Sequence, residues 1–321
     1  MFMLRLKMWL LVTVLFGIVY ALVVMLGYYA GISNFYFYLA VSVGIMLLQY
    51  MMGPLIVQWT MRVRYIERKD NPALYNMVEG LAVQAGIPMP RVAISDITLP
   101  NAFAFGRSVK DGRVCVTSGI LRLLNAGELR AVLGHEISHI KNRDVLTITI
   151  LSVIPLIMYR IAWQFLFFGR GRSNNRSGGG AALIGLAAFI FYFITNLLVL
   201  YASRIREYFA DRGSVELGNS PSDLASSLYK LVYGSARTDK EEVREYEGLK
   251  AFFVNDPSQA MNEIRELRQL DTNSDGSIDL AELAALSNKN VRLNFADKLM
   301  EALSTHPNML RRIKKLSDYN R

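Results

Sequence analysis

The stretch GHEISHIKNRD, residues 134–144, places two of the chain's three histidines four residues apart. In a helix, positions i and i+4 lie on one face, so His135 and His139 can direct their imidazoles at one ion. Glu136 lies beside them, close enough to reach a metal-bound water. In this H-E-x-x-H arrangement the histidines bind zinc and the glutamate acts as general base. The alternative is an amphipathic helix with two histidines that face solvent.

A catalytic zinc ion needs three protein ligands and an open fourth position for water. The stretch SRIREYFAD, residues 203–211, places Glu207 and Asp211 four residues apart on one helical face. Glu207 could complete a site of two histidines and one glutamate. Asp211 could accept the free ring N–H of a ligand histidine and so fix its tautomer. The alternative is a solvated helix face on which the carboxylates pair with neighbouring arginines.

A second ion is indicated by DTNSDGSIDLAE, residues 271–282, which matches the calcium-loop pattern D-x-[DN]-x-[DN]-G-x5-E in every specified position. Helical sequences flank the stretch on both sides, and Gly276 supplies the sharp turn. The alternative is a polar surface loop without an ion. The candidate Ca²⁺ ligands are Asp271, Asn273, Asp275, Ser277 through its backbone carbonyl, Asp279 and Glu282.

Two uncharged apolar stretches, 8–31 and 34–59, are each longer than the roughly 20 residues that a membrane-spanning helix needs. Basic residues precede the first stretch and follow the second, whereas the short turn between them has no charge. This asymmetry predicts a transmembrane hairpin with both ends in the cytoplasm, retained as an anchor. The hairpin and its basic flank form a first segment, 1–69.

Two further hydrophobic stretches, 145–168 and 181–203, are separated by the polar loop GRGRSNNRSGGG. Pro155 and Arg160 interrupt the first of them, and the loop carries three arginines that oppose an external location. The pair could span the membrane, lie in its interface, or pack on the protein as a hairpin. A hairpin would return the chain to the side it left, so that Glu207 could face the histidine helix.

The elements that must position these side chains are readable from apolar spacing and stop signals. An amphipathic helix is expected within 71–85, and short strands at 91–94 and 113–117. The histidine helix should begin at Asn125, with Glu128 completing a capping box. We expect a catalytic domain in two parts, 70–144 and 204–321, separated by 145–203, with the calcium-like loop inserted around 258–290.

The composition narrows the class of protein. Hydrophobic residues make up 52% of the 321 residues, so part of the chain is expected in lipid. The net charge of +9 resides largely beside hydrophobic stretches, which indicates contact with lipid headgroups and not with nucleic acid. The single cysteine, Cys115, excludes an internal disulfide and fits a reducing compartment, with a packing role in a strand.

Four segments, in this order, resemble the HtpX-type membrane-bound zinc metalloendopeptidases, which are related to the prenyl-protein (CAAX) proteases. They are PNAFAFG (100–106), GHEISHIKNRD, SRIREYFAD and STHP…RI (304–313). The resemblance implies a mainly α integral membrane protein with an α+β zincin-like catalytic domain and a small sheet, to which the EF-hand-like loop is an inserted addition. It implies that His135, His139 and Glu207 bind Zn²⁺, that Glu136 is the base, and that Asp211 supports a ligand.

The same resemblance assigns roles to three further residues. Asn101 and Ala102 would lie on an edge strand that pairs with the extended substrate. His306 would hydrogen-bond the oxyanion of the tetrahedral intermediate. The alternative for His306 is the start of a helix with Pro307 at its first position. The residues after this His-Pro pair depart from the family's pattern, which has a proline and acidic residues there.

The sequence therefore predicts a multi-pass protein of the cell (inner) membrane with a cytoplasmic active site. We expect a zinc endopeptidase that cleaves misfolded or damaged membrane proteins in a stress response and is modulated by Ca²⁺. One alternative is a prenyl-protein endopeptidase, which would need a cavity for a lipid chain. Another is a calcium-responsive membrane scaffold without catalysis. The substrate, the cleavage preference and the oligomeric state are left open.

Overall fold

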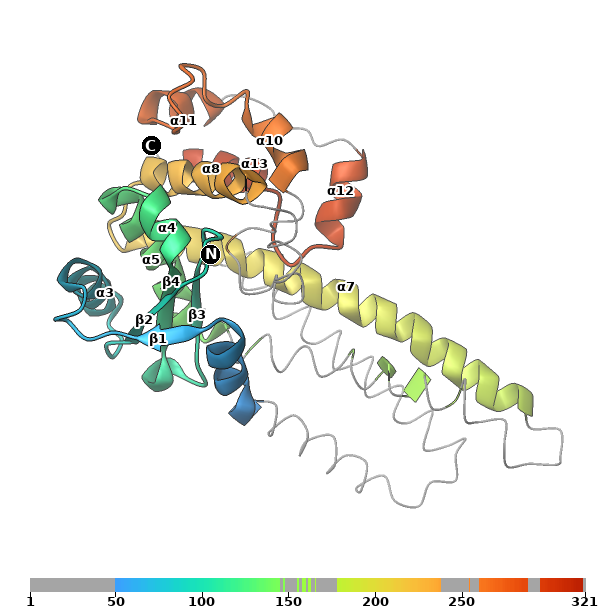
Figure 1. Ribbon diagram of the computed structural model, residues 1–321. Helices are drawn as coiled ribbons and strands as arrows, with labels where there is room; N and C mark the ends of the chain where they lie inside the picture. Colours follow the sequence, from blue (N-terminus) through green and yellow to red (C-terminus); the bar gives the residue numbers. More distant parts are fainter. Residues whose placement is uncertain are drawn as a thin grey trace. The chain divides into compact units, whose positions relative to one another are not determined.

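The computed structural model describes residues 50–144, 178–237, 260–287 and 295–319, with a few isolated positions between them. The chain divides into two compact units (Figure 1). Unit one comprises 1–52 and 146–205, and unit two comprises 53–145 and 206–321. Most of the expected transmembrane hairpin, most of 145–168 and the loop up to residue 177 lie outside the described residues, so their arrangement stays a prediction.

Unit two contains a small mixed sheet with the strand order β1-β2-β4-β3. The inner strands β2 and β4 are parallel, with Arg91 opposite Arg113, and the outer strands pair with them in antiparallel fashion. Strands β2 and β4 were expected from their residues, and β3 contains Ala102 of the edge strand that the resemblance implied. Strand β1 has only three residues and carries no readable pattern. The strands are β1 Val63–Tyr65, β2 Arg91–Ser95, β3 Ala102–Phe105 and β4 Arg113–Thr117.

The helices of unit two account for most of its described residues. In the order of the chain they are α3 Pro72–Ala85, α4 Ser118–Leu123, α5 Ala126–Lys141, α8 Pro221–Arg237, α10 Ala260–Leu267, α11 Leu280–Ser287, α12 Phe295–Ala302 and α13 Met309–Ser317. A single 3-10 turn, Val109–Asp111, precedes β4. The described part of the molecule is thus mainly helical with a small sheet.

Helix α5 begins as the sequence predicts. The Asn125 side chain accepts a hydrogen bond from the Glu128 backbone N–H at 2.9 Å, and the Glu128 carboxylate accepts one from the Asn125 N–H at 3.0 Å. This capping box satisfies two backbone donors at the helix start. The Glu128 carboxylate is also 2.7 Å from Lys230 Nζ on α8, so the same residue ties two helices together. The helix is fixed at its first turn.

Helix α3 also forms where the apolar spacing predicts it. Leu74, Val78 and Leu81 are buried on its inner face, which packs against α5. Gly86 ends the helix in a left-handed conformation, with φ of 67°. A residue with a side chain rarely adopts this conformation, which explains glycine at the helix C-cap. The side chains of α3 and α5 belong to one hydrophobic core that also includes α8 and α13.

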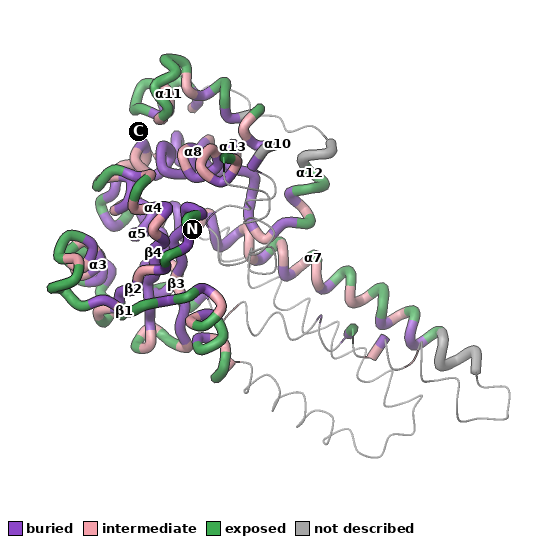
Figure 2. Tube along the Cα trace, viewed as in Figure 1, coloured by how far each residue is buried: buried purple, intermediate pink, exposed green. Residues whose placement is uncertain are grey.

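The other face of the sheet has its own core. Phe103, Phe105 and Cys115 pack there with Met61, and Cys115 has no exposed surface. The packing role predicted for this cysteine is therefore confirmed. Figure 2 shows mostly buried residues in β3 and β4, whereas β1 is only partly buried and much of α11 is exposed. The sheet is thus covered on both faces, which fixes the position of its edge strand β3.

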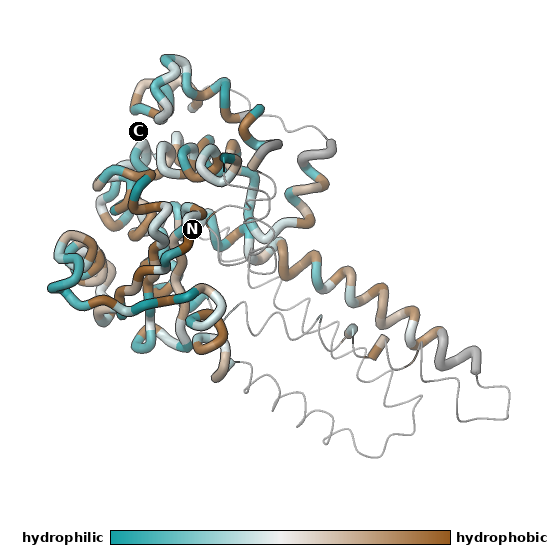
Figure 3. The backbone as a smooth tube through the Cα atoms, viewed as in Figure 1, coloured by the Kyte–Doolittle hydropathy of each residue, from teal (hydrophilic) through white to brown (hydrophobic). Residues whose placement is uncertain are grey.

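Helix α7 extends from Gly178 to Glu216 and belongs to unit one as far as Ile205. Its 39 residues correspond to about 58 Å of helix, nearly twice the roughly 30 Å of a bilayer core. Within Leu183–Glu216, the most apolar window of 18 residues has a mean hydropathy of 2.4, and 28% of this window is buried. Leu183 is 69% exposed and Phe193 is 52% exposed. Figure 3 shows hydrophobic residues along this part of α7.

Such an exposed apolar surface is unfavourable in water, so α7 has both the length and the composition of a membrane-crossing helix. Within unit one, Met158 and Ala162 pack against Ala188 of α7. These described residues of the third hydrophobic stretch therefore lie beside the fourth. Residues 50–60 are also helical and expose Trp59 to 84%, as interfacial aromatic side chains do.

Candidate metal centre

The candidate ligands come from two helices of unit two. Helix α5 supplies His135 and His139, and the last turns of α7 supply Glu207. The Nε2 atoms of the two histidines are 3.1 Å apart. Glu207 Oε2 is 3.6 Å from His135 Nε2, and its Oε1 is 3.5 Å from His139 Nε2. The nitrogen and oxygen lone pairs therefore converge on one point.

This arrangement fits a tetrahedral ion. Ligand atoms about 2.0–2.2 Å from a zinc ion, at tetrahedral angles, are roughly 3.3–3.6 Å from one another. The two separations between Glu207 and the histidines, 3.6 and 3.5 Å, lie within that range, and the 3.1 Å between the histidine nitrogens is slightly shorter. Among the residues that the structure describes, this is the one group of at least three such side chains with ligand atoms within 4.8 Å of one another. His135 is 1% exposed and Glu207 is 6% exposed, so a solvent-facing pair of histidines and a solvated acidic face are both wrong.

The far nitrogen of each ring has an acidic partner. His135 Nδ1 is 2.9 Å from Asp211 Oδ1, and His139 Nδ1 is 2.5 Å from Asp144 Oδ2. A hydrogen bond at Nδ1 fixes the tautomer that leaves Nε2 free to bind a metal. Asp211 makes the contact that the sequence analysis predicted, whereas no role was predicted for Asp144. Asp144 also forms an ion pair with the buried Arg206.

Asp144 could have been found from the sequence only by its position just beyond the end of α5. The turn that brings it back toward His139 includes Arg143, whose φ of 58° is in the left-handed region. Such a conformation is uncommon for a residue with a side chain and is not readable from spacing.

The electrostatics of the site favour a cation. Burial lowers the pKa of His135, but its hydrogen bonds to Asp211 and Glu207 outweigh this effect and raise the pKa to about 10. Burial raises the pKa of Glu136 above its ordinary value, and the adjacent histidines offset part of that shift. A carboxylate with a raised pKa is a better proton acceptor at neutral pH. The shift of the Glu136 pKa is therefore in the direction that favours a general base.

Glu136 is held by the edge strand of the sheet. Its Oε2 accepts a hydrogen bond from the Ala104 backbone N–H at 2.7 Å. The Asn101 carbonyl accepts from the Thr117 N–H of β4 at 2.9 Å. Because backbone groups alternate along a strand, those of Ala102 and Ala104 point away from β4, toward the free edge. Helix α5 and the edge of β3 are therefore neighbours at the site.

The Asn101 side chain is buried and supports the start of β3. The residue is fully buried, and its Oδ1 accepts a hydrogen bond from the Val254 N–H at 3.1 Å. Its backbone N–H donates to Thr117 Oγ1 at 2.8 Å. Asn101 therefore joins β4 to the segment around residue 254, whereas Ala102 follows it at the start of β3. The backbone of Ala102, and not the amide of Asn101, faces the free edge.

The late His-Pro motif reaches the same site. His306 Nδ1 is 3.4 Å from Glu207 Oε2, and the residue is 8% exposed. The interpretation of Pro307 as the first helical residue is wrong. Helix α13 begins at Met309, and the Asn308 side chain caps it by accepting from the Leu310 N–H. Pro307 thus precedes the cap and leaves His306 turned toward the metal ligands.

Arg312 is a functional residue that the sequence reasoning missed. It lies in the same motif, has no exposed surface, and is 3.1 Å from Glu207 Oε2. Its Nε and Nη2 donate to the two carboxylate oxygens of Asp211 at 2.9 and 2.6 Å. The sequence signals were its place in the segment STHP…RI (304–313) and its otherwise apolar position in an amphipathic helix, where an arginine is usually exposed.

Two glycines allow α5 and α7 to approach closely. A Cβ atom added to Gly213 of α7 would be 2.7 Å from Ser138 Cβ of α5. One added to Gly134 of α5 would be 2.8 Å from Ser214 Oγ of α7. The Ser214 hydroxyl donates to the Ala131 carbonyl across the same contact, at 2.6 Å. The distance between the histidines and Glu207 therefore depends on the absence of these side chains.

The calcium-like loop is separate from this site and joins α10 to α11. Gly276 has a φ of 81° and Ile278 is 2% exposed, so the loop turns at glycine and is anchored by an apolar residue. Asp271 Oδ2 accepts from the Gly276 N–H at 2.9 Å and from the Tyr229 hydroxyl at 3.0 Å. The Glu282 carboxylate accepts from the Thr272 N–H at 2.7 Å.

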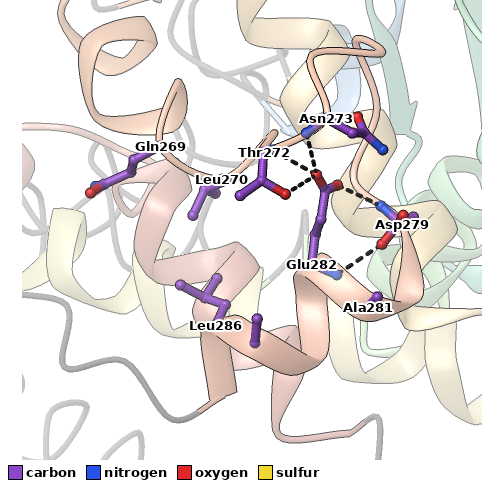
Figure 4. Close-up of a pocket in the computed structure, with 9 residues that line it drawn as sticks. Gln269, Leu270, Thr272, Asn273, Asp279, Ala281, Glu282 and Leu286 are labelled. Carbon is purple, nitrogen blue, oxygen red and sulfur yellow. Dashed lines mark hydrogen bonds between the residues drawn. The ribbon is translucent and has the colours of Figure 1, made fainter.

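A cavity of about 280 Å³ is lined in part by Glu282, Leu270 and Leu286. Figure 4 shows these side chains. The Glu282 carboxylate also accepts a hydrogen bond from the Asp279 N–H at 3.1 Å. Among the described residues, the carboxylates of this loop do not gather as closely as the ligands of the histidine site. The loop therefore has the local turn of the calcium pattern, with its acidic side chains bound to loop donors.

Residues 68–320 match the model of Peptidase family M48. The chain belongs to peptidase family M48. Its resemblance to the HtpX-type enzymes is confirmed, and with it the prediction of a metalloendopeptidase. Membership of the family implies zinc, and the geometry above shows that the histidine and glutamate ligands of this M48 peptidase fit such an ion.

Two curated relatives support the assignment. The Protease HtpX homolog of Methanothermobacter thermautotrophicus is 51% identical over 229 residues, which cover 71% of this chain and 86% of that protein. Protease HtpX homolog 2 of Methanosarcina acetivorans is 41% identical over 208 residues, 64% of this chain and 71% of its own. The crystal structure of S. mikatae Ste24p aligns with a TM-score of 0.47 and 15% identity, over 98% of this chain and 67% of that one.

We expect Gly213→Ala to lower the Tm of the purified peptidase and to weaken zinc binding, because the added methyl group would push α7 from α5. Overpacking of this kind costs about 1–3 kcal/mol. The matched control is Gly80→Ala in α3, where an added Cβ meets nothing within 4 Å. The control should be neutral or stabilising by up to about 1 kcal/mol, since alanine favours helix. Equal Tm and zinc affinity for Gly213→Ala and wild type would contradict the close-packing explanation.

Proposed function

We propose that this M48 peptidase is a membrane-embedded zinc endopeptidase that hydrolyses peptide bonds of misfolded or damaged membrane proteins on the cytoplasmic side. The observation that carries the proposal is the convergence of His135, His139 and Glu207, at separations of 3.1, 3.6 and 3.5 Å, beside the buried Glu136. Three ligands leave the open position that a catalytic site keeps for water.

The chemistry follows from the positions of these side chains. Zinc, when bound by the three ligands, supplies Lewis-acid polarisation of a water and of the scissile carbonyl. Glu136 accepts a proton from the attacking water and later delivers it to the leaving amine as the C–N bond breaks. The Ala104 N–H, 2.7 Å from Glu136 Oε2, orients this carboxylate. Asp211 and Asp144 hold the two histidine rings in the ligand tautomer.

The substrate is proposed to bind as an added strand at the free edge of β3. The backbone groups of Ala102 and the carbonyl of Ala104 face that edge, where an extended peptide could form main-chain hydrogen bonds, whereas the Ala104 N–H is bound to Glu136. Recognition through the backbone depends little on substrate side chains and suits a protease of misfolded proteins. Asn101 supports the strand through its bonds to Thr117 and Val254. His306 is proposed to donate a hydrogen bond to the developing oxyanion.

The location in the membrane is supported by α7. Its first part exposes large apolar side chains, and the same continuous helix supplies Glu207 in its last turns. A helix of about 58 Å can cross the roughly 30 Å bilayer core and still extend beyond it by several turns. We therefore propose that α7 crosses the membrane and carries Glu207 at its cytoplasmic end.

We expect Glu136→Gln to retain zinc and fold but to lose about 10²–10⁴-fold in the rate of peptide cleavage, because glutamine cannot accept the proton from water. The measurement is cleavage of casein by detergent-purified, zinc-loaded protein. Cleavage at the wild-type rate by Glu136→Gln would refute the assigned role of the base. Bound zinc without cleavage by wild type would instead favour the non-catalytic scaffold.

The topology can be tested with a new cysteine in the loop between the third and fourth hydrophobic stretches. Cys115 is fully buried, so a maleimide that cannot cross membranes should label only a Ser173→Cys variant. If α7 crosses the bilayer from outside to cytoplasm, Ser173→Cys should react in intact cells, although the three arginines of its loop oppose an external location. Reaction only after permeabilisation would place the loop in the cytoplasm and contradict the proposed crossing.

We further propose that Ca²⁺ binds the loop Asp271–Glu282 and modulates the peptidase by ordering the segment that precedes His306. The loop matches the full calcium pattern, with Gly276 at the turn. Both of its flanking helices contact α13. The Met309 N–H donates to Glu263 of α10 at 3.2 Å, and Lys314 Nζ donates to the Leu286 carbonyl of α11 at 2.8 Å. A change in α10 and α11 would therefore reach the helix that follows His306.

The double variant Asp271→Ala and Glu282→Ala should abolish calcium binding in a calorimetric titration and remove any effect of calcium on casein cleavage. The loss is expected because both ends of the ligand set are removed. Glu67→Ala is the control, since this carboxylate is 74% exposed and pairs only with a surface lysine. Unchanged calcium binding and unchanged activity in the double variant would remove this proposal while leaving the zinc peptidase intact.

A further inference from the structure

We propose that Arg312 is a positioning residue of the metal centre, which holds the ligand Glu207 and the histidine partner Asp211 in their working orientations. The inference rests on the proposed zinc site and adds a residue that does not touch the ion or the substrate. Its basis is the contacts of one buried guanidinium, which engages two carboxylates from the same face of α7.

All three guanidinium nitrogens of Arg312 donate hydrogen bonds. Nε and Nη2 donate to Oδ2 and Oδ1 of Asp211, at 2.9 and 2.6 Å. Nη1 donates to the Val254 carbonyl at 2.9 Å and is 3.1 Å from Glu207 Oε2. The planar guanidinium matches a carboxylate through two parallel N–H bonds, which fixes orientation as well as distance. Asp211 is therefore clamped on one side by Arg312 and faces His135 on the other.

The contact with Glu207 distinguishes its two oxygens. Oε2 is near Arg312, 3.4 Å from His306 Nδ1 and 3.6 Å from His135 Nε2, whereas Oε1 is 3.5 Å from His139 Nε2. A carboxylate held at one oxygen by a cation has fewer orientations available to it. Arg312 therefore limits rotation of the Glu207 side chain before any ion binds, and this preorganisation reduces the entropic cost of coordination.

Arg312 also makes the burial of these charges possible. Glu207 is 6% exposed and Asp211 is 2% exposed, so two carboxylates one helical turn apart are held out of water. Buried charges of like sign are unfavourable unless an opposite charge compensates them. The guanidinium provides this charge permanently, because arginine does not lose its proton in proteins.

Helix α13 sets the position of the guanidinium. Met309, Ile313 and Leu316 are buried in the core shared with α8, and the Asn308 side chain caps the helix start. The adjacent residue, Arg311, points elsewhere: its Nη1 is 2.6 Å from Glu301 Oε2, and its side chain is 41% exposed. Two neighbouring arginines thus have different surroundings on one helix, which provides a matched comparison.

The test uses the full-length, detergent-purified protein and measures zinc affinity by competition with a chromogenic chelator. Arg312→Met should weaken zinc binding by about 10–100-fold, the loss typical when the partner of a metal ligand is removed. Arg312→Lys keeps the charge but not the planar fork, so its zinc affinity should be intermediate. Arg311→Met should bind zinc as wild type does. In zinc-saturated enzyme, Arg312→Lys should lower kcat and leave KM unchanged, because only the metal centre is displaced.

Wild-type zinc affinity in Arg312→Lys together with wild-type kcat would overturn the proposal, even if Arg312→Met fails to fold. An equal loss of zinc affinity in Arg311→Met would also overturn it, since the effect would then belong to α13 in general. The outcome is separable from that of the proposed function. A protein that binds zinc but cleaves nothing would refute the peptidase, whereas loss of zinc affinity in the Arg312 variants would still establish the positioning role.

Discussion

The close contact between α5 and α7 is the constraint on which the rest of unit two depends. Each helix presents an acidic or histidine pair at i, i+4 spacing, and the pairs face each other only because Gly134 and Gly213 have no side chains. A methyl group at either position would occupy space taken by a serine of the partner helix. The ligand separations of 3.1–3.6 Å are thus set by helix packing as well as by side-chain rotamers.

This contact buries several charges, and the surrounding elements compensate for them. Asp144 lies against His139 and Arg206, whereas Asp211 lies between His135 and Arg312. Each ligand histidine therefore has a carboxylate behind it, and each of these carboxylates has an arginine. Buried ionic networks of this kind stabilise only when every member is paired, and they fix one arrangement of the groups. The bound ion would add a positive charge at the centre of this network.

The remaining elements supply access and support. The edge strand β3 holds Glu136 and leaves backbone groups of Ala102 directed at the same site. The C-terminal helices bring His306 and Arg312 to Glu207 from more than 90 residues farther along the chain. Helix α13 also contacts α10 and α11, so the segment with the calcium pattern adjoins the supports of the metal centre. The proposed catalysis, substrate binding and regulation by calcium would all depend on these contacts.

The sequence by itself determined the features that depend on neighbours along the chain. The spacing of His135 and His139, the capping box at Asn125 and the glycine that ends α3 each follow from local geometry, so they were readable without the fold. The family resemblance extended this reading to Glu207 and Asp211. The short strand β1 was not predicted, because three residues are too few to show the alternation of polar and apolar side chains that marks a strand.

Only the tertiary structure decided which distant charges pair. Asp144 turns back to His139 through a left-handed residue, and Arg312 reaches Asp211 across 101 positions of the chain. A sequence pattern marks arginine and aspartate as surface residues, because it does not contain the partners that make their burial favourable. The same limit applies to Gly134 and Gly213, whose role exists only where two helices touch. The metal ligands are thus encoded locally, and the groups that hold them in place are a product of the fold.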